Sequence, residues 1–115
     1  MKEHIMKLAP YPFEMIRNGK KTIELRLYDE KRKSISNGDR ITFVNTDDDN
    51  DLLRVKVENM FVFNSFEELY KKLPLLECGY TENDVSMASP DDMNQYYSKD
   101  KQMQYGVVGI KIRLI

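Results

Sequence analysis

Polar and apolar residues alternate most regularly between Thr22 and Tyr28. The apolar row consists of Ile23, Leu25 and Leu27, and the polar row consists of Thr22, Glu24, Arg26 and Tyr28. A period of two is typical of a β-strand with one buried face, so this segment is predicted to be a strand. We expect the apolar row to enter the core and the polar row to line the opposite face of the sheet.

The same kind of pattern predicts four further strands, at 3–8, 40–44, 53–63 and 105–115. Turn residues 37–39 precede the second of these strands. The acidic stretch 46–51 predicts an exposed hairpin loop that leads into the third. We expect the last strand to close the sheet. Its two glycines, Gly106 and Gly109, indicate a bulge or a close approach of backbone or ligand.

Helical signals are clearest in two places. One short helix is predicted from Pro10 to Gly19, because two prolines suit its first turn and an Asn-Gly pair suits its C-terminal end. A second helix is predicted from Ser65 to Pro74, where Ser65 and Glu68 have the spacing of a capping box and apolar residues recur at helical spacing. Segment 75–101 predicts one or two short helices.

The number and order of these elements indicate the fold class. A chain of 115 residues is long enough for one core, so we expect a single domain spanning 1–115. Strands outnumber helices, and the short early connections favour antiparallel pairing. We therefore predict an α+β, β-dominated fold: a small, partly closed β-barrel with short helices packed at its ends.

The charge balance restricts the possible partners. A formal net charge of −1 argues against a protein that coats duplex DNA, because such binding needs many basic side chains on one surface. Charge is nevertheless uneven, since segment 17–33 contains seven basic residues against three acidic ones, and 47–51 is acidic. One end of the domain is therefore suited to attract phosphate.

Other classes of protein find little support in the sequence. No stretch is long and apolar enough for a membrane helix and no signal peptide is recognisable, so we expect a cytoplasmic protein without a membrane partner. One cysteine, Cys78, and one histidine, His4, are too few for a disulfide or a conventional zinc site. Motifs for phosphate loops and common hydrolases are missing, so we expect no metal and no cofactor.

The segment from Gly19 to Arg26 contains the strongest candidate site. Its polar members are Lys20, Lys21, Thr22, Glu24 and Arg26. A guanidinium on this row can hold a phosphate, and a carboxylate can accept from a base or a sugar hydroxyl. The alternative is that Glu24 and Arg26 pair with each other on a solvated face of the sheet.

Lysine and tyrosine side chains offer further candidates. Crowding or burial could lower the pKa of Lys21 enough for it to act as a general base, although an ordinary exposed lysine is the simpler interpretation. Tyr96 and Tyr97 offer a stacking surface for an unpaired base, and Lys99 a phosphate contact, unless the tyrosines pack on the core. Two glutamates, Glu67 and Glu68, fit structural roles at the start of their helix.

Three stretches together resemble the ASCH domain family, particularly its small bacterial single-domain members. They are the Gly-Lys-Lys-Thr-Ile-Glu-Leu-Arg run at 19–26, the Asn-Gly-Asp-Arg-Ile-Thr-Phe run at 37–43 and the Tyr-Gly-Val-Val-Gly-Ile run at 105–110. The resemblance covers nearly the whole chain. It implies a barrel similar to the PUA domain, with RNA or a nucleotide as partner in RNA metabolism or translation-related regulation. Lys21, Glu24 and Arg26 match the family's polar cleft residues.

The same resemblance implies an enzymatic alternative. Some small bacterial members hydrolyse the amide of the modified nucleoside N4-acetylcytidine with a lysine, a threonine and a glutamate. Lys21 matches the lysine, but Glu24 occupies the position of the threonine, and Thr22 is not equivalent to it. Glu67 or Glu68 is a possible third member of a catalytic set with Lys21 and Glu24. Ribonuclease activity is a further alternative.

A protein-interaction role is the third interpretation. The stretch 87–105 is rich in Met and Tyr, which suit adaptable contact surfaces. The sequence therefore leaves open whether the partner is a nucleotide or a protein, and whether the domain is an enzyme.

Overall fold

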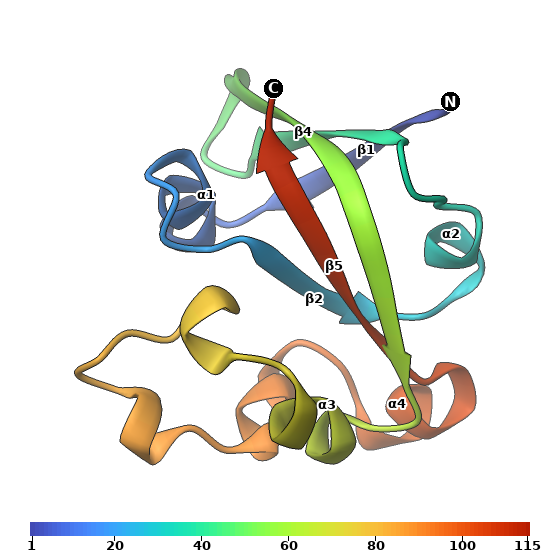
Figure 1. Ribbon diagram of the computed structural model, residues 1–115, viewed down its shortest axis with the longest axis vertical. Helices are drawn as coiled ribbons and strands as arrows, with labels where there is room; N and C mark the ends of the chain where they lie inside the picture. Colours follow the sequence, from blue (N-terminus) through green and yellow to red (C-terminus); the bar gives the residue numbers. More distant parts are fainter.

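The computed structural model describes residues 1–115. Its elements follow the chain in the order shown in Figure 1. They are β1 (Glu3–Leu8), α1 (Pro10–Arg17), β2 (Ile23–Leu27), α2 (Glu30–Lys33), β3 (Arg40–Asn45), β4 (Asp48–Phe63), α3 (Phe66–Lys72), the 3-10 segments η1 (Leu75–Glu77), η2 (Val85–Met87) and η3 (Pro90–Gln95), α4 (Lys99–Tyr105) and β5 (Val107–Leu114). The predicted β-dominated α+β class with short helices is confirmed.

The five strands form one sheet with the order β1-β3-β4-β5-β2, curved into a half-barrel (Figure 1). Three ladders are antiparallel, as expected, but β1 and β3 are parallel. The expectation of antiparallel pairing early in the chain was wrong there, because a crossover containing α1, β2 and α2 separates these two strands and allows them to run the same way. The last strand, β5, lies inside the sheet rather than closing it.

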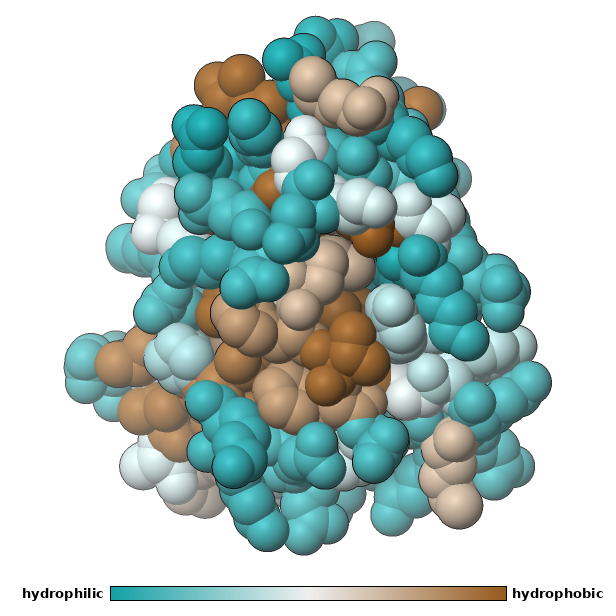
Figure 2. Space-filling model, turned by 45° about the vertical axis from the view of Figure 1, so that its right-hand side comes forward, coloured by the Kyte–Doolittle hydropathy of each residue, from teal (hydrophilic) through white to brown (hydrophobic).

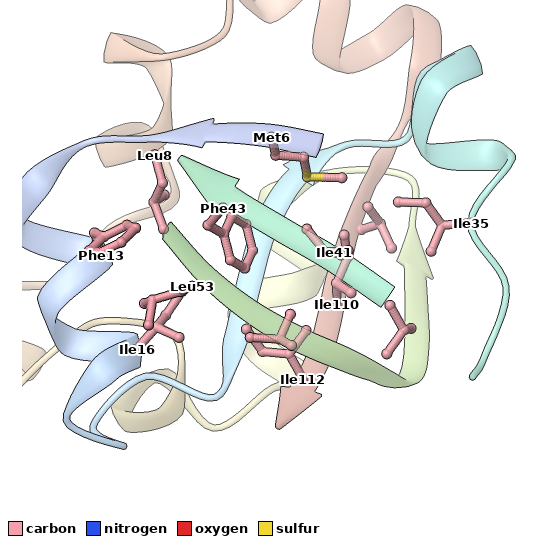
Figure 3. Close-up of a cluster of buried hydrophobic side chains, with 13 residues drawn as sticks. Met6, Leu8, Phe13, Ile16, Ile35, Ile41, Phe43, Leu53, Ile110 and Ile112 are labelled. Atoms are coloured by element: carbon pink, nitrogen blue, oxygen red, sulfur yellow. The ribbon is translucent and has the colours of Figure 1, made fainter. Parts of the chain in front are cut away.

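Two buried clusters hold the molecule together. The inside of the half-barrel contains thirteen buried apolar residues from the sheet, from α1 and from the segment between α2 and β3, including Phe13, Phe43 and Ile110 (Figure 3). The other cluster lies between the sheet and the helical segments that follow β4, and it includes Leu25, Phe66 and Leu69. Figure 1 shows these helical segments gathered on one side of the sheet.

The apolar row of β2 enters the core, as expected, and it belongs to the outer cluster. Ile23, Leu25 and Leu27 pack under the helical segments. Glu24 lies opposite Ile110, and Arg26 lies opposite Val108. Directly opposed residues of an antiparallel pair share a face of the sheet. Ile110 and Val108 belong to the cluster inside the half-barrel, so the polar row of β2 points toward that inside as well. Both faces of β2 are therefore covered by other parts of the protein. The alternation of polar and apolar residues in the sequence cannot show that the polar face is covered too.

The boundaries of several elements differ from the predictions. The hairpin between β3 and β4 is tighter than a loop at 46–51, because Asn45 already pairs with Asp48. Segment 75–101 forms three 3-10 segments before α4, and α4 occupies the start of the predicted last strand, which begins at Val107. Helix α2 had no clear periodic signal, since it is four residues long.

The local signals at helix ends were accurate. Ser65 caps α3 by accepting from the backbone N–H of Glu68 at 3.1 Å. At Gly109 the close approach is that of a side chain and not of backbone or ligand, since a Cβ there would lie 2.6 Å from Cδ1 of Leu73 on the outer face of the sheet. At Gly106 the expected close approach of backbone is confirmed, since a Cβ there would lie 2.9 Å from the carbonyl oxygen of Phe63.

The surface combines polar and apolar areas. Figure 2 shows an apolar area surrounded by polar residues on one face of the molecule. Val62 on β4 and two methionines in the helical region, Met87 and Met103, are among the exposed large apolar side chains. None of the helices has both the length and the apolar character that a membrane span requires.

Candidate functional site

A pocket of about 400 Å³ lies beside the open side of the half-barrel. The two edge strands of the sheet, β1 and β2, both contribute to its wall, and α1, α3 and the segments after α3 complete it. We call it the seam pocket. Its polar and aromatic lining includes Lys7, Lys21, Glu24, Arg26, Tyr80, Asp92, Tyr96 and Tyr97.

The end of α1 places Lys21 in the seam pocket. Gly19 has a φ of +76°, and its N–H donates to the carbonyl of Ile16 at 3.0 Å. The N–H groups of Lys20 and Lys21 then both donate to Met15 O. This pattern is a Schellman turn, which favours glycine at the residue after the cap. The turn reverses the chain and delivers Lys21 directly to the start of β2.

Lys21, Glu24 and Arg26 form a buried ion-paired group, which we call the polar triad. Lys21 Nζ lies 2.8 Å from Glu24 Oε1, and Arg26 Nε lies 2.7 Å from Glu24 Oε2. Glu24 is only 3% exposed. The predicted pairing of Glu24 with Arg26 is therefore present, but in a buried position and not on a solvated face.

Arg26 also bridges the two edge strands. Its Nη2 donates to the carbonyl of Lys7 on β1 at 2.9 Å. Because β1 and β2 are not hydrogen-bonded neighbours in the sheet, this contact links the two edges through a side chain. The half-barrel is thus closed beside the seam pocket by a guanidinium.

The charges of the polar triad stabilise one another. Burial acts to raise the pKa of Glu24, but the nearby charges of Lys21 and Arg26 outweigh it and hold the pKa below its ordinary value. Burial acts to lower the pKa of Arg26, and the Glu24 carboxylate outweighs this, so that the pKa is raised. The triad therefore carries two positive charges and one negative charge at neutral pH.

Aromatic side chains form another part of the wall. Tyr97 stacks on Phe66 of the outer cluster, with centroids 6.2 Å apart and ring planes at 16°. Tyr96 is 65% exposed at the pocket. Of the two roles considered for this pair, core packing therefore applies to Tyr97, whereas Tyr96 presents an accessible ring.

Tyr80 connects two further lining residues by hydrogen bonds. Its hydroxyl donates to Asp92 Oδ2 at 2.7 Å and also lies 2.7 Å from the hydroxyl of Tyr70. Burial and these hydrogen bonds raise the pKa of Tyr80, and burial also raises that of Tyr97. These phenols are therefore neutral at neutral pH, and Tyr80 donates its single O–H to Asp92.

Cys78 also lines the seam pocket but is poorly suited to act as a nucleophile. Burial raises the pKa of its thiol to about 12, and the side chain is 5% exposed. The thiolate is the reactive form of cysteine, so this thiol is unreactive at neutral pH. His4, the single histidine, contacts Asp39 at 2.9 Å instead.

The remaining predicted residues lie outside the seam pocket. Thr22 Oγ1 donates to Glu77 Oε1 at 2.8 Å and accepts from Lys111 Nζ at 3.1 Å. Lys20 is exposed. Glu67 and Lys99 line a separate surface groove with Met103. Glu68 is exposed in the first turn of α3, and neither it nor Glu67 approaches Lys21 in the lining of the seam pocket.

Several lining residues were missed by sequence reasoning. Lys7, Tyr70, Tyr80 and Asp92 lie far from 21–26 in the sequence and carry no motif of their own. The capping box that Ser89 and Asp92 form at η3 is the one local signal that marks any of them. Their grouping arises from the tertiary fold.

Comparison with known proteins gives consistent matches. A family model described as the ASCH domain matches residues 6–115. The crystal structure of hypothetical protein PH0355 is 35% identical, with a TM-score of 0.80 and coverage of 100% of both chains. Protein PF0455 from Pyrococcus furiosus is 34% identical, with a TM-score of 0.73 and coverage of 100% of this chain and 98% of that chain.

More distant structures share the fold. A mutant of the ASCH protein from Zymomonas mobilis is 18% identical, with a TM-score of 0.69, and covers 98% of this chain and 70% of that one. No curated protein matches the sequence.

Proposed function

The chain belongs to the ASCH domain family, and from this premise and the polar triad we propose that it binds a nucleotide, free or within single-stranded RNA, in the seam pocket. The observation that carries the proposal is the combination of buried cations with an accessible aromatic ring. A nucleotide needs hydrogen-bond donors for its oxygens and a flat apolar surface for its base, and the seam pocket offers both.

Lys21 supplies donors for the ligand. An ammonium group has three N–H bonds, and Glu24 is the single protein partner of Lys21 Nζ within salt-bridge distance. The other donors of Lys21 are therefore available to a phosphate oxygen. Arg26 uses Nε for Glu24 and Nη2 for Lys7, which leaves further guanidinium donors.

Glu24 has a positioning role in this proposal. Both of its oxygens are held by the neighbouring cations, so the carboxylate fixes the side chains of Lys21 and Arg26 at the pocket. Tyr96, which is exposed at the rim, stacks on the base. Single-stranded nucleic acids gain roughly 1–3 kcal/mol per base from such stacking.

The test is a titration of cytidine 5′-monophosphate and a short single-stranded RNA, followed by NMR chemical-shift changes. Wild-type protein is expected to shift at Lys21, Arg26 and Tyr96. Lys21→Met is expected to weaken binding about tenfold or more, because a charge-assisted hydrogen bond contributes roughly 1.5–3 kcal/mol. RNA binding by this variant should also lose about one unit of salt slope.

Lys20→Met provides the matched control. Lys20 precedes Lys21 in the sequence, but it is exposed and does not line the seam pocket, so its replacement should leave affinity within about twofold. Equal losses in the two variants would show bulk charge attraction and would contradict the proposal. Circular dichroism of each variant verifies that the fold is retained.

The same samples test the enzymatic alternative. N4-acetylcytidine is added and free acetate is measured with and without Lys21→Met, and the length of the RNA is followed in parallel. Acetate release that disappears in the variant would replace the binding proposal with an amidohydrolase. Intact substrate and intact RNA would leave binding as the function.

A further inference from the structure

The edge of β2 has unpaired main-chain groups beside the seam pocket. In its ladder with β5, the N–H of Ile112 donates to Thr22 O at 2.9 Å, and the N–H of Tyr28 donates to Gly106 O at 3.0 Å. Hydrogen-bonded and non-hydrogen-bonded pairs alternate along an antiparallel ladder. The main-chain N–H and C=O groups of the even-numbered residues of β2 therefore point toward β5. Those of Leu25 point the other way, toward the open edge of the sheet.

Leu25 differs from the other residues that point to this edge. Ile23 and Leu27 do not line the seam pocket, but Leu25 does. Its side chain packs in the outer cluster, on the face opposite to Glu24 and Arg26. The backbone of Leu25 lies on the open edge of β2, which borders the seam pocket.

On the other edge strand, β1, side chains donate hydrogen bonds to main-chain carbonyls that point away from the sheet. Glu3, Ile5 and Lys7 are the residues of β1 whose carbonyls point away from β3, and two of these carbonyls accept hydrogen bonds from side chains. Lys31 Nζ donates to Ile5 O at 2.8 Å, and Arg26 Nη2 donates to Lys7 O at 2.9 Å. None of the side-chain or loop hydrogen bonds involves the N–H or C=O of Leu25. The donor and the acceptor of Leu25 are therefore both available.

The geometry of an extended residue determines which ligand fits. Its N–H and C=O lie side by side, roughly 3 Å apart, and point the same way. They match a ligand that presents an acceptor beside a donor, such as the Watson–Crick edge of a nucleobase. A peptide strand pairs with several residues of an edge, whereas only Leu25, of the three β2 residues whose main-chain groups point to this edge, lines the pocket.

We propose that the N–H and C=O of Leu25 bind the Watson–Crick edge of the nucleobase, which makes this backbone residue the base-recognition element of the seam pocket. The inference rests on the proposed nucleotide binding and adds the atoms that contact the base. Cytidine supplies a matching pair, since its N3 accepts and its N4 amine donates. A base that is already paired in a duplex has no free edge and is excluded.

The experiment compares cytidine 5′-monophosphate with two analogues by NMR on isotopically labelled protein. N4,N4-dimethylcytidine 5′-monophosphate lacks the donor and should bind about tenfold more weakly, because one hydrogen bond is lost and the Leu25 carbonyl is left without a partner. The 5-methyl analogue carries its methyl group away from this edge and should bind within about twofold. Ribose 5-phosphate measures the contribution of sugar and phosphate alone.

The amide of Leu25 supplies a second readout. Its exchange with solvent should slow at least tenfold on addition of cytidine 5′-monophosphate, while the amides of Ile23 and Leu27 should be unaffected.

Each contrary result has a separate meaning. Shifts at Lys21 and Tyr96 without a change at Leu25, together with equal binding of both analogues, would overturn the base-recognition element and leave the proposed function intact. Absence of shifts with every nucleotide would overturn both. A strand-forming peptide that shifts Ile23, Leu25 and Leu27 together would assign this edge to a protein partner and overturn the inference.

Discussion

At the scale of single residues, the carboxylate of Glu24 connects stability with the proposed site. It is 3% exposed and is held by Lys21 and Arg26 at 2.8 and 2.7 Å. A buried charge is tolerated only when it is paired and hydrogen-bonded. The carboxylate that would position Lys21 and Arg26 as hydrogen-bond donors to the ligand is therefore also one that the fold requires.

Replacement of Glu24 by glutamine should be strongly destabilising. A neutral amide cannot balance two buried cations, and breaking such a group typically costs roughly 3–5 kcal/mol. Urea unfolding of Glu24→Gln measures the loss. Glu67→Gln is the control, because Glu67 is exposed and pairs with Lys71 on the surface, so its effect should stay within about 0.5 kcal/mol. Similar small effects for both variants would contradict a structural role for Glu24.

Asp39 is a second buried carboxylate with defined partners. It accepts hydrogen bonds from the backbone N–H groups of Lys2 and Ser36 at 3.0 and 2.9 Å, and it contacts His4 Nε2 at 2.9 Å. The His4 hydrogen bond, followed by that of Lys2, lowers the pKa of Asp39 well below its ordinary range. These contacts attach the N-terminal strand to the turn before β3.

Stability should therefore depend on pH through Asp39. The pKa is lower in the folded state than in the unfolded state, where it is about 3.9, so the contribution is present above this value and is lost as the pH falls below it. Urea midpoints at pH 6 and pH 3 should differ less for Asp39→Asn than for wild-type protein. Identical pH profiles would show that Asp39 makes no such contribution.

At the scale of elements, β2 is unusual because both of its faces are covered. Its apolar row packs under the helical segments, and its polar row lies beside the seam pocket. Alternation predicted the strand and its two rows correctly. It could not show which of the two buried clusters receives the apolar row, because that depends on helices which follow β2 by about forty residues or more in the sequence.

Contact between β5 and the helical segments can be tested at Gly109. A Cβ there would lie 2.6 Å from Leu73 Cδ1 and 3.2 Å from Ile23 Cγ2. Gly109→Ala should cost about 1–3 kcal/mol by overpacking. In the Leu73→Ala background the nearest obstacle is removed, so the cost should fall by at least about 0.5 kcal/mol. A double-mutant cycle from urea unfolding measures this coupling, and strict additivity would contradict the contact.

At the scale of the whole molecule, the seam pocket joins the half-barrel to the helical segments. Its wall contains Lys7 and Arg26 from the edge strands together with Tyr80 and Tyr96 from the later segments. A ligand in this pocket contacts both parts of the structure at once. Binding should therefore stabilise the molecule as a unit, because the pocket exists only in the folded state.

Thermal unfolding measures this stabilisation. Cytidine 5′-monophosphate at a hundred times its Kd should add about 2.7 kcal/mol, which corresponds to a Tm increase on the order of 10 °C for a chain of this length. Lys21→Met at the same ligand concentration should show a smaller increase, whereas Lys20→Met should match wild-type protein. An unchanged Tm at ligand saturation would contradict binding to the folded state.

The sequence by itself determined the local features of this protein. The alternating rows of β2, the cap at Ser65 and the Gly19 turn were all predictable, because each depends on residues that are close in the chain. The polar triad was also predictable as a group, since Lys21, Glu24 and Arg26 lie within six positions, and the resemblance to the ASCH family rests on the same run.

Tertiary structure alone decided how these features are combined. The parallel pairing of β1 with β3, the inward orientation of Glu24 and the approach of Tyr80 and Tyr96 to Lys21 all depend on contacts between distant segments. No local pattern specifies such contacts, because sheet order and curvature depend on how the whole chain packs around its cores. The same closure leaves the edge of β2 unpaired at Leu25, which is where we place recognition of the base.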